Sequence, residues 1–361
     1  MASLPALLRP ELADAKAYLP VLGDFRVRLD ANEAPPLFPP SVRERLAQAF
    51  AEVPVERYPD ATASDLRAAI AERLGVDPAE VLLGVGSDEL ITMLLTAFAR
   101  PRRASEPPLV LTTSPTFVMY RLSARLRSQR VIEVPLDANW DLAEKGMLQA
   151  IEISAPHVIF IASPNNPTGT VVDLARLERV IEAAKDSLVV VDEAYVNYAD
   201  RDRLDLFRRY ENVAILRTLS KIGFASLRVG WMVGRRELVA ELDKVRLPYN
   251  LNGISQALAS VVVRELWGEV ETVIAQVVGE RARLQERLSA LPGLSVAPAQ
   301  ANFLWVKTER PAEELFSGLK ALGVLVRSFH SHGGRLTHQL RITVGTPAEN
   351  DELVRCWREL G

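Results

Sequence analysis

The sequence predicts an α/β fold: a large domain with a mostly parallel sheet, followed by a smaller α+β domain. Two observations support this prediction. From Val81 onwards, short apolar runs alternate with amphipathic stretches, which is typical of buried parallel strands covered by helices on both faces. The chain has 361 residues, and at about 150 residues per domain this length favours two domains.

The residues before Val81 predict an extended segment and two helices. Ala34–Pro40 contains four prolines, which restrict their own backbone and that of the preceding residue and so exclude a helix. Ser41–Glu52 has a helical pattern, and Ser64–Leu74 has apolar residues at helical spacing with Ser64 as its expected N-cap. After Val81, the pattern predicts strands within residues 81–84, 109–115, 157–164, 187–195 and 213–221, and helices within residues 87–99, 117–128 and 173–185.

The C-terminal part predicts strands mixed with helices. Glu265–Leu291 is expected to form one long helix that ends at Pro292-Gly293. Strands are expected within residues 302–308, 324–329 and 340–345, and helices near Ala312–Leu322 and from Pro347. The expected division is an N-terminal arm of residues 1–30 that packs with the small domain or a partner subunit, a large domain of residues 31–250 and a small domain of residues 251–361.

Composition excludes several classes of function. The 43 Lys and Arg residues nearly balance the 46 Asp and Glu residues, so no basic field favours nucleic acid as a partner. Cys356 is the single cysteine, which excludes an intrachain disulfide, and His330 and His332 have no third ligand nearby, so no metal is expected. Arg9 and Glu11 interrupt any signal-peptide core, and no apolar run approaches the roughly 20 residues that span a bilayer. We therefore expect a cytoplasmic protein with no membrane partner.

Several predicted strand ends carry residues that are able to bind a ligand. In open α/β sheets, ligands bind where strands run into loops at their carboxyl ends. Gly84–Glu89 (GVGSDE) lies between a strand and a helix, where backbone N–H groups and the helix N-terminus favour an anion; the alternative is a tight turn capped by Ser87. Asn166 in SPNNPTG presents an amide from a rigid turn, or it supports the turn itself.

Two further strand ends carry a carboxylate and an amine. Asp192 follows the apolar run Leu188–Val191, where it needs a cationic partner such as a protonated pyridine nitrogen, or is an ordinary buried Asp paired with an arginine or capping a helix. Tyr195 could reach the same ligand. Lys221 ends the run RTLSK, where a lysine among apolar and hydroxyl groups can form a Schiff base; a surface lysine is the alternative.

Arginines complete the set of candidates. Ser220 and Arg228 are suited to bind phosphate, because a guanidinium binds it in a forked geometry. Arg341 in LRITV and Arg327 in VLVRSF are each able to bind a carboxylate or phosphate, or are solvated charges at a sheet edge. A phosphate cup, an Asp for a pyridinium, an Asn, a Tyr and a Schiff-base Lys together indicate pyridoxal 5′-phosphate.

The sequence resembles the fold-type I aminotransferases, and within them it is most similar to the histidinol-phosphate aminotransferase family. The resemblance covers nearly the whole chain and rests on SPNNPTG, VVVDEAY and RTLSK, together with LDANEAPP (29–36), RYPD (57–60), GVGSDELI (84–91), SPTFVMY (114–120), RLPYN (246–250), ANF (301–303) and RITVGTPAEN (341–350). It implies a large domain with a seven-stranded, mostly parallel sheet. It also implies transamination of L-histidinol phosphate with 2-oxoglutarate, which gives imidazole-acetol phosphate and glutamate in histidine biosynthesis.

The resemblance also implies roles for individual residues. Lys221 would join the cofactor and shuttle a proton, with Asp192 and Tyr195 as the other catalytic residues. Asp192 would hold the pyridine nitrogen protonated, while Asn166 and Tyr195 would bond the ring hydroxyl. The remaining residues implied are Ser87, Asp88, Ser220 and Arg228 around the phosphate, Phe117 against the ring, Tyr58 reaching the phosphate from the other subunit of an obligate homodimer, and Arg341, Arg327, Tyr18, Asn32 and Tyr249 at the substrate.

The sequence departs from the family pattern at two places. Phe117 stands where a tyrosine is common, so ring stacking remains but a hydroxyl is lost. The loop IGFASL (222–227) makes the spacing from Lys221 to Arg228 one residue shorter than in many of these enzymes, which puts the pose of Arg228 in question. Other activities stay open: an aromatic amino-acid aminotransferase, a pyridoxal phosphate-dependent O-phosphothreonine decarboxylase, and a ligand-sensing domain.

Overall fold

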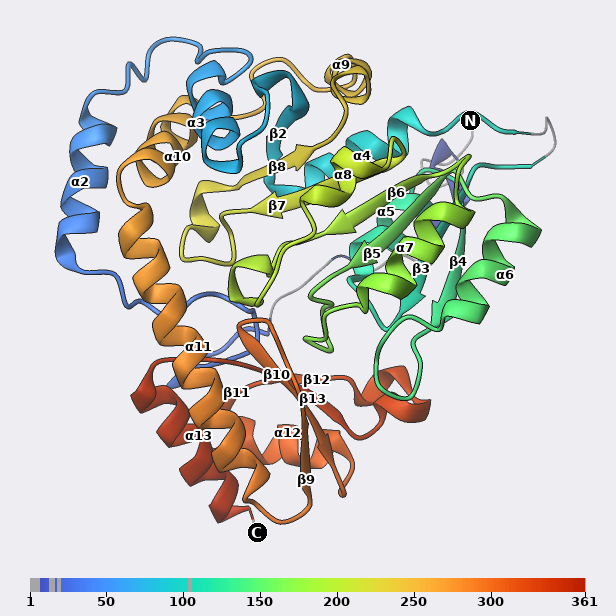
Figure 1. Ribbon diagram of the computed structural model, residues 1–361. Helices are drawn as coiled ribbons and strands as arrows, with labels where there is room; N and C mark the ends of the chain where they lie inside the picture. The colour runs from blue at the N-terminus through green and yellow to red at the C-terminus, as the bar shows by residue number, and fades with distance from the viewer. Residues whose placement is uncertain (1–6, 13–16, 18–20, 103–105, 361) are drawn as a thin grey trace.

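The computed structural model describes residues 7–12, 17, 21–102 and 106–360, which form a larger and a smaller lobe (Figure 1). The larger lobe contains a seven-stranded sheet with the order β2-β8-β7-β6-β5-β3-β4. Its strands are β2 (Val81–Val85), β3 (Leu109–Ser114), β4 (Arg130–Pro135), β5 (Val158–Ala162), β6 (Leu188–Asp192), β7 (Val213–Thr218) and β8 (Val229–Val233). All neighbouring pairs are parallel except those of β8, which runs antiparallel to β2 and β7.

Helices cover both faces of this sheet, as the continuous apolar strands predict. Successive residues of β6 alternate between the two faces: Val189 and Val191 belong to one apolar cluster and Val190 to the other. The first cluster includes residues of α2 (Pro40–Ala51), α3 (Ser64–Leu74), α6 (Glu144–Ser154), α7 (Leu174–Ala183), α8 (Asp205–Arg209) and α10 (Gly253–Arg264), and the second includes residues of α4 (Gly86–Ala97), α5 (Val118–Arg125) and α9 (Arg236–Asp243).

Several local features differ from the sequence-based prediction. Ser64 is not the N-cap of α3: Ala63 takes that place with a φ of 47°, and Ser64 is the first residue of the helix. The carboxylate of Asp60 caps this end instead, accepting a hydrogen bond from the Ser64 backbone N–H at 2.7 Å. Strands β4 and β8 were not predicted; β8 follows within eleven residues of β7 and reverses direction, which the alternation of strands and helices does not signal.

The smaller lobe contains a four-stranded antiparallel sheet with α-helices beside it. The strand order is β12-β13-β10-β9. The strands are β9 (Leu294–Ala297), β10 (Phe303–Thr308), β12 (Arg327–Ser328) and β13 (Gln339–Thr343), and the helices are α11 (Trp267–Ser289), α12 (Ala312–Ala321) and α13 (Pro347–Glu359). Strand β1 (Val27–Arg28) pairs in parallel with β11 (Val324–Leu325), which ties residues 27–28 to this lobe.

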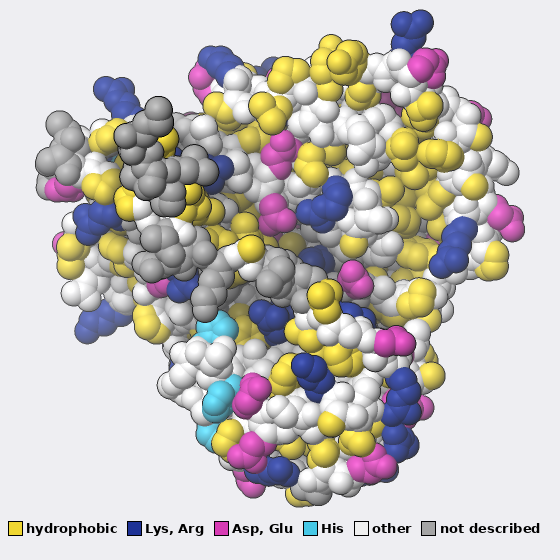
Figure 2. All heavy atoms as spheres, turned by 180° about the vertical axis from the view of Figure 1, so that it is seen from behind, with side chains coloured by type: hydrophobic (Ala, Val, Ile, Leu, Met, Phe, Trp, Pro, Cys, Tyr) yellow, Lys and Arg dark blue, Asp and Glu magenta, His cyan; other side chains and the backbone are white. Residues whose placement is uncertain are grey.

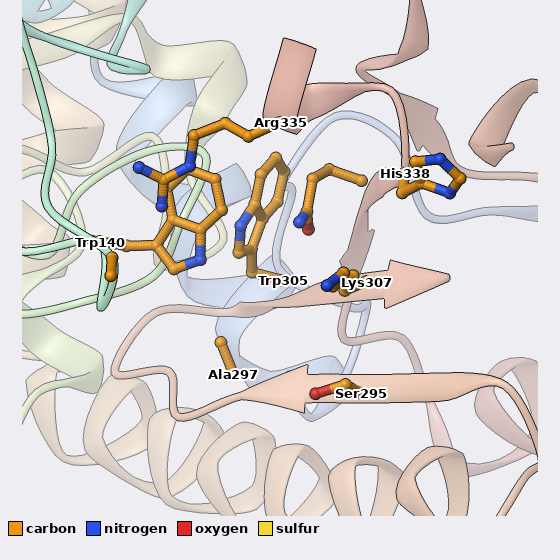
Figure 3. Close-up of a pocket in the computed structure, with 9 residues that line it drawn as sticks. Trp140, Ser295, Ala297, Trp305, Lys307, Arg335 and His338 are labelled. Atoms are coloured by element: carbon orange, nitrogen blue, oxygen red, sulfur yellow. The ribbon is translucent and has the colours of Figure 1, made fainter. Parts of the chain in front are cut away.

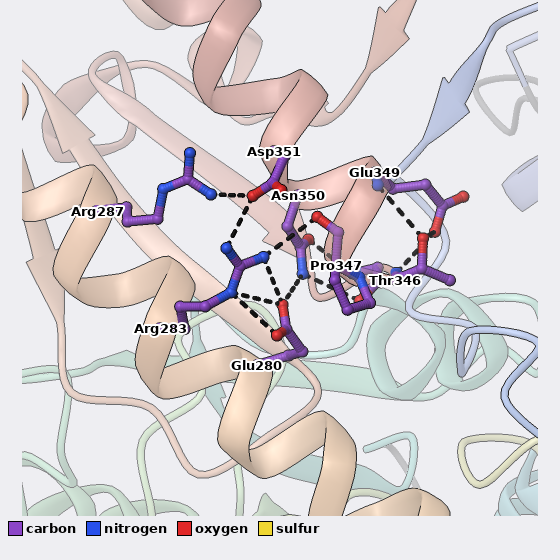
Figure 4. Close-up of polar contacts among 9 residues, drawn as sticks. Glu280, Arg283, Arg287, Thr346, Pro347, Glu349, Asn350 and Asp351 are labelled. Carbon is purple, nitrogen blue, oxygen red and sulfur yellow. Dashed lines mark hydrogen bonds and ion pairs between the residues drawn. The ribbon is translucent and has the colours of Figure 1, made fainter.

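Polar contacts fix α13 against α11 (Figure 4). Arg283 donates to Glu280 at 2.9 Å and to Asp351 at 2.8 Å. The start of α13 is closed by a capping box between Thr346 and Glu349, in which each side chain binds the backbone N–H of the other residue. These contacts hold the helix that follows the candidate substrate-binding strand β13.

The apolar clusters indicate which helices pack with each lobe, and so where the two predicted domains divide. Residues of α10 and the N-terminal half of α11 pack into the first cluster of the larger lobe, whereas Leu284 and Leu288 belong to a cluster formed by the smaller lobe with Val27 and Leu29. The boundary at residue 250 stays a prediction, and the packing favours a division within α11. None of the described helices combines the length and the apolar composition that crossing a membrane requires.

Candidate active site

Three predicted site residues lie at the same edge of the larger sheet. Asp192 is the last residue of β6, Asn166 follows β5, and Lys221 follows β7. Because β5, β6 and β7 are adjacent and parallel, their carboxyl ends meet at one edge. Strand order therefore brings together residues that are up to 55 positions apart in the chain.

The carboxylate of Asp192 is buried, with 4% of the residue exposed. Burial raises its pKa, while a hydrogen bond from Tyr120 opposes that rise. The Tyr120 hydroxyl donates to Oδ2 at 2.6 Å, and the Ala194 backbone N–H donates to Oδ1 at 3.0 Å. Among the described residues, Asp192 therefore neither pairs with an arginine nor caps a helix, the two ordinary alternatives. A neutral phenol as its main partner leaves this carboxylate suited to a cationic ligand.

Lys221 lies beside an aromatic residue of the same edge. Its Nζ is 5.7 Å from the centre of the Tyr195 ring. The Tyr198 hydroxyl donates to the Lys221 carbonyl at 2.6 Å, which fixes the backbone that carries the amine. The Tyr195 hydroxyl accepts a hydrogen bond from Asn32 Nδ2 at 2.9 Å, so the ring has one orientation.

An anion cradle lies at the start of α4. Gly86 has a φ of 70°, and a Cβ there would lie 2.7 Å from Arg228 Nη2. A Cβ on Gly230 of β8 would lie 2.6 Å from the Ser87 backbone nitrogen. Both glycines therefore permit a close approach of β8, the Arg228 guanidinium and the N-terminus of α4, where backbone N–H groups favour an anion.

The Arg228 side chain is held loosely in this cradle. Its two terminal nitrogens lie 3.4 Å from Ser220 Oγ and 3.4 Å from Asp88 Oδ2, and 45% of the side chain is exposed. The shortened loop from Lys221 forms a 3₁₀ turn at Ala225–Leu227, after which Arg228 takes a left-handed backbone with a φ of 53°. The shorter spacing therefore still places the guanidinium beside Ser220 and Asp88.

Phe117 borders the same edge as the N-cap residue of α5. Its ring meets the Tyr120 ring edge-to-face, with 5.6 Å between the ring centres. Tyr120 in turn stacks on Phe160 of β5 at 4.8 Å. Phe117 is thus linked through one ring to the carboxylate of Asp192.

The smaller lobe contributes Arg341 from β13. This arginine is 9% exposed; its Nη1 donates to Asn166 Oδ1 at 2.7 Å and its Nη2 donates to the Asp30 carbonyl. Arg327 of β12 is paired directly opposite Arg341, so both side chains lie on the same face of the small sheet. Of the two arginines, Arg341 is buried and bonded to the large-lobe loop, and Arg327 is exposed.

The other predicted substrate residues have different surroundings. Asn32 is buried and accepts a hydrogen bond from Thr343 Oγ1 at 3.1 Å, next to Tyr195. Tyr58 and Tyr249 stack on each other with 4.7 Å between ring centres, and Tyr58 is 82% exposed. Tyr18 lies outside the described residues.

Several residues around the site were not predicted from the sequence. Tyr120 holds Asp192, Gly230 admits the helix N-terminus, Asp30 binds Arg341 through its carbonyl, and Asn302 donates to the Asn32 carbonyl at 3.0 Å. Asp30, Tyr120 and Asn302 lie in or beside the segments LDANEAPP, SPTFVMY and ANF, which is the signal that would have found them. Gly230 lies in an unpredicted strand.

Comparison with known proteins identifies the family. The profile described as "Aminotransferase class I and II" matches residues 26–356. Histidinol-phosphate aminotransferase 1 of Carboxydothermus hydrogenoformans is 39% identical over 355 residues, which cover 97% of each chain. That of Burkholderia lata is 40% identical over 329 residues, covering 91% of this chain and 90% of its own. This chain belongs to the class I and II aminotransferases.

A solved structure shares the fold of this aminotransferase. The histidinol-phosphate aminotransferase of Sinorhizobium meliloti, in complex with pyridoxal 5′-phosphate, superposes with a TM-score of 0.84 at 24% identity and covers 98% of both chains. The predicted fold class, an α/β fold with a mostly parallel seven-stranded sheet and a smaller α+β lobe, is confirmed.

The residues of this aminotransferase fit that cofactor. The cradle of Gly86, Gly230 and Arg228 leaves backbone and guanidinium donors for a phosphate. Asp192 supplies a buried carboxylate for a ring cation, and Lys221 an amine for an aldehyde. The donor set therefore matches the phosphate, the ring nitrogen and the reactive carbon.

Proposed function

We propose that the protein is a pyridoxal 5′-phosphate-dependent transaminase that converts L-histidinol phosphate and 2-oxoglutarate into imidazole-acetol phosphate and glutamate. The observation that carries the chemistry is the convergence of Lys221, buried Asp192 and the Arg228 cradle at one sheet edge. The substrate is inferred from the relatives, which are named histidinol-phosphate aminotransferases at 39% and 40% identity over nearly the whole chain.

Lys221 is the base and acid of the proposed reaction. When bound, the cofactor takes up the electron pair that is left when the substrate loses its Cα proton. The Lys221 amine accepts that proton at Nζ and returns a proton for the next step. The bond from Tyr198 to the Lys221 carbonyl keeps the backbone fixed while the amine moves.

The other residues bind and orient. The Asp192 carboxylate keeps a proton on the ring nitrogen, because an ionised carboxylate in a buried site favours the cationic form of its partner. Asn166 and Tyr195 bond the ring hydroxyl, and Phe117 covers the ring. The phosphate is held by Ser87, Asp88, Ser220 and Arg228, with the first two acting through the N-terminus of α4.

Arg341 binds the anionic group of either substrate. It is fixed from both lobes by Asn166 and the Asp30 carbonyl, and a guanidinium donates to a phosphate or to a carboxylate in the same forked geometry. Arg327 shares its face of the sheet and adds positive charge. Asn32, Tyr249 and Tyr18 are proposed as further substrate residues.

The proposal includes a homodimer, with Tyr58 reaching the cofactor phosphate of the partner subunit. Exposed apolar side chains support it: Val55, Tyr58, Leu247 and Tyr249 are all exposed. Hydrophobic side chains gather on the part of the larger lobe that carries α2, α3 and α10 (Figure 2), and such patches mark protein interfaces. Analytical ultracentrifugation tests the dimer. We also propose a cytoplasmic location, which imaging of a tagged full-length chain tests.

Half-reactions test the proposed substrate. The cofactor-loaded protein is mixed with L-histidinol phosphate alone, and the visible absorbance of the bound cofactor is followed. A change faster than that caused by phenylalanine or tyrosine supports the proposal. A response to aromatic amino acids alone would instead indicate an aromatic aminotransferase, and release of CO₂ from O-phosphothreonine without a keto acid would indicate a decarboxylase.

A further inference from the structure

A cavity lies between the two lobes, on the face of the small sheet that carries Arg341, where Trp305 of the lining is paired with Arg341. Its volume is about 400 Å³, within the range of small-molecule sites. Figure 3 shows it between a loop of the larger lobe and one face of the small sheet. The residues that line it are Ala138 and Trp140 from that loop, Ser295, Ala297, Trp305, Lys307 and Gln339 from the sheet, and Arg335 and His338 from the segment before β13.

Aromatic rings and a guanidinium form one wall of this cavity (Figure 3). The rings of Trp140 and Trp305 meet edge-to-face with 5.6 Å between centres. The Arg335 guanidinium lies 3.6 Å from the centre of the Trp140 ring, and its two terminal nitrogens donate to the carbonyls of Leu136 and Asp137 at 2.9 Å each. The wall is therefore held in place across the junction of the lobes.

The charge of the lining is positive. Lys307 and Arg335 contribute cations, and none of the lining residues is acidic. Among the residues that the structure describes, no carboxylate forms an ion pair with either cation. Burial lowers the pKa of Arg335, opposed by the charge of Asp137. A small anion in the cavity would meet two cations without displacing an existing ion pair.

Two buried polar atoms in the lining have no hydrogen-bond partner within the described part of the chain. They are Nε1 of Trp305, a residue that is 1% exposed, and Oε1 of Gln339, a residue that is 3% exposed. An indole N–H needs an acceptor and an amide oxygen needs a donor, and a buried group without its partner carries a cost in free energy. Both atoms belong to residues that line the same cavity.

We propose that this cavity binds a small aromatic hydroxy acid. Its carboxylate would bind Lys307 and Arg335, its ring would pack against Trp140, and its hydroxyl would donate to Gln339 Oε1 and accept from Trp305 Nε1. None of Lys221, Asp192 and Arg341 lines the cavity, although Trp305 of the lining is paired with Arg341, so the proposed site borders the active site without sharing these residues. Because the lining comes from both lobes, the bound ligand would link them.

Calorimetry with the cofactor-loaded full-length protein tests the proposal, with 4-hydroxybenzoate as the probe. We expect one binding site per chain, weaker binding of benzoate, which lacks the hydroxyl, and no binding of benzyl alcohol, which lacks the charge. Lys307→Gln should weaken 4-hydroxybenzoate binding about tenfold, as the loss of one charge-assisted hydrogen bond does. Lys320→Gln is the matched control, because Lys320 is an exposed lysine on α12 and does not line the cavity.

Transaminase activity separates this site from the active site. Lys307→Gln should keep the wild-type kcat and KM, because Lys307 takes no part in the proposed reaction. Equal affinity of the wild type and Lys307→Gln, or no binding by the wild type up to about 1 mM, would overturn the proposal. Loss of binding in Arg341→Gln with unchanged binding in Lys307→Gln would place the probe in the active site and would also overturn it.

Discussion

The two lobes place their arginines at the candidate site in different ways. Arg228 of the larger lobe is 45% exposed in its side chain, and its contacts to Ser220 and Asp88 are both 3.4 Å long. Arg341 of the smaller lobe is 9% exposed and bonds Asn166 of the opposite lobe at 2.7 Å. Arg228 therefore keeps donors for an anion, whereas Arg341 is oriented in advance.

This difference separates two kinds of binding. A cofactor that stays bound orders a loosely held guanidinium only once, when it is incorporated and accepts hydrogen bonds from it. Substrates of two shapes exchange in every cycle, and an arginine that is already oriented loses less side-chain entropy at each exchange. Arg341 also joins the lobes through Asn166, so the proposed substrate binding and the junction of the lobes would share one side chain.

The largest effect is expected from the strand-end chemistry of the larger lobe. Lys221→Ala removes the only amine proposed to move the Cα proton, and loss of a general acid–base group costs about 10² to 10⁴ in rate. We expect kcat to fall by about 10³-fold or more, measured by glutamate formation. Lys185→Ala changes an exposed lysine and should keep full activity. Equal activity of both variants would contradict the role of Lys221.

Strand-end residues of the larger lobe could be predicted from the sequence. Asp192, Asn166 and Lys221 each follow an apolar run that predicts a buried strand, and parallel strands bring their carboxyl ends to one edge. A charged or amide residue directly after such a run is visible in the sequence, and no knowledge of distant contacts is needed to single it out.

Partners that meet through tertiary packing could not be predicted in this way. Tyr120 donates a hydrogen bond to Asp192, which lies 72 residues later in the chain. The helical spacing of apolar residues predicts only that Tyr120 lies on a helix. Asn32 and Thr343 meet although 311 residues separate them. Gly230 matters because β8 is inserted antiparallel between β2 and β7, and the strand itself was missed. Sheet order and register decide these contacts.

The next largest effect tests the orientation of the small-lobe arginine. Arg341→Lys keeps the charge but loses the fork that binds Asn166 and an anion together. We expect kcat/KM to fall about 10²-fold for both the amine and the keto acid, since loss of a partner in a buried charged hydrogen bond costs about 2–5 kcal/mol. Arg327→Lys is the matched control on the same face and should lose less than Arg341→Lys. A larger loss in Arg327→Lys would reverse the roles of the two.

A smaller effect tests the close packing behind the loosely held arginine. A Cβ on Gly230 would lie 2.6 Å from the Gly86 carbonyl carbon and the Ser87 nitrogen, so Gly230→Ala must shift the start of α4. We expect about 1–3 kcal/mol of lost stability in urea, as overpacking costs, together with weaker retention of the cofactor on dialysis.

Gly268→Ala provides the control for this substitution. Gly268 lies in α11, and a Cβ there would have no described atom of another element within 4 Å. Alanine at this position should therefore be neutral or should raise stability by up to about 1 kcal/mol. Unchanged stability and cofactor retention in Gly230→Ala would show that α4 tolerates the shift, and the cradle would then not depend on this close approach.

The smallest effect concerns how the folding stability of the cofactor-free protein depends on pH. Burial raises the pKa of Asp192 in the folded chain above its ordinary value, so the folded state holds a proton that the unfolded state has released. Stability then falls as pH rises from about 3.9, the unfolded pKa of Asp, through the folded pKa. Asp192→Asn cannot ionise and its stability does not fall in this way, so its stability relative to the wild type should increase as pH rises above about 4 in urea titrations.

Loading the cofactor should reverse this order at about pH 7. A ring cation facing Asp192 favours the ionised carboxylate, so the loaded wild type should become more stable than loaded Asp192→Asn. Without cofactor, Asp192→Asn should be the more stable of the two. The reversal is expected only for a carboxylate that has no cationic partner until the cofactor binds. If the wild type gained stability relative to Asp192→Asn with rising pH even without cofactor, Asp192 would already be ionised and stabilised within the chain. The phenol of Tyr120 would then be sufficient as its partner.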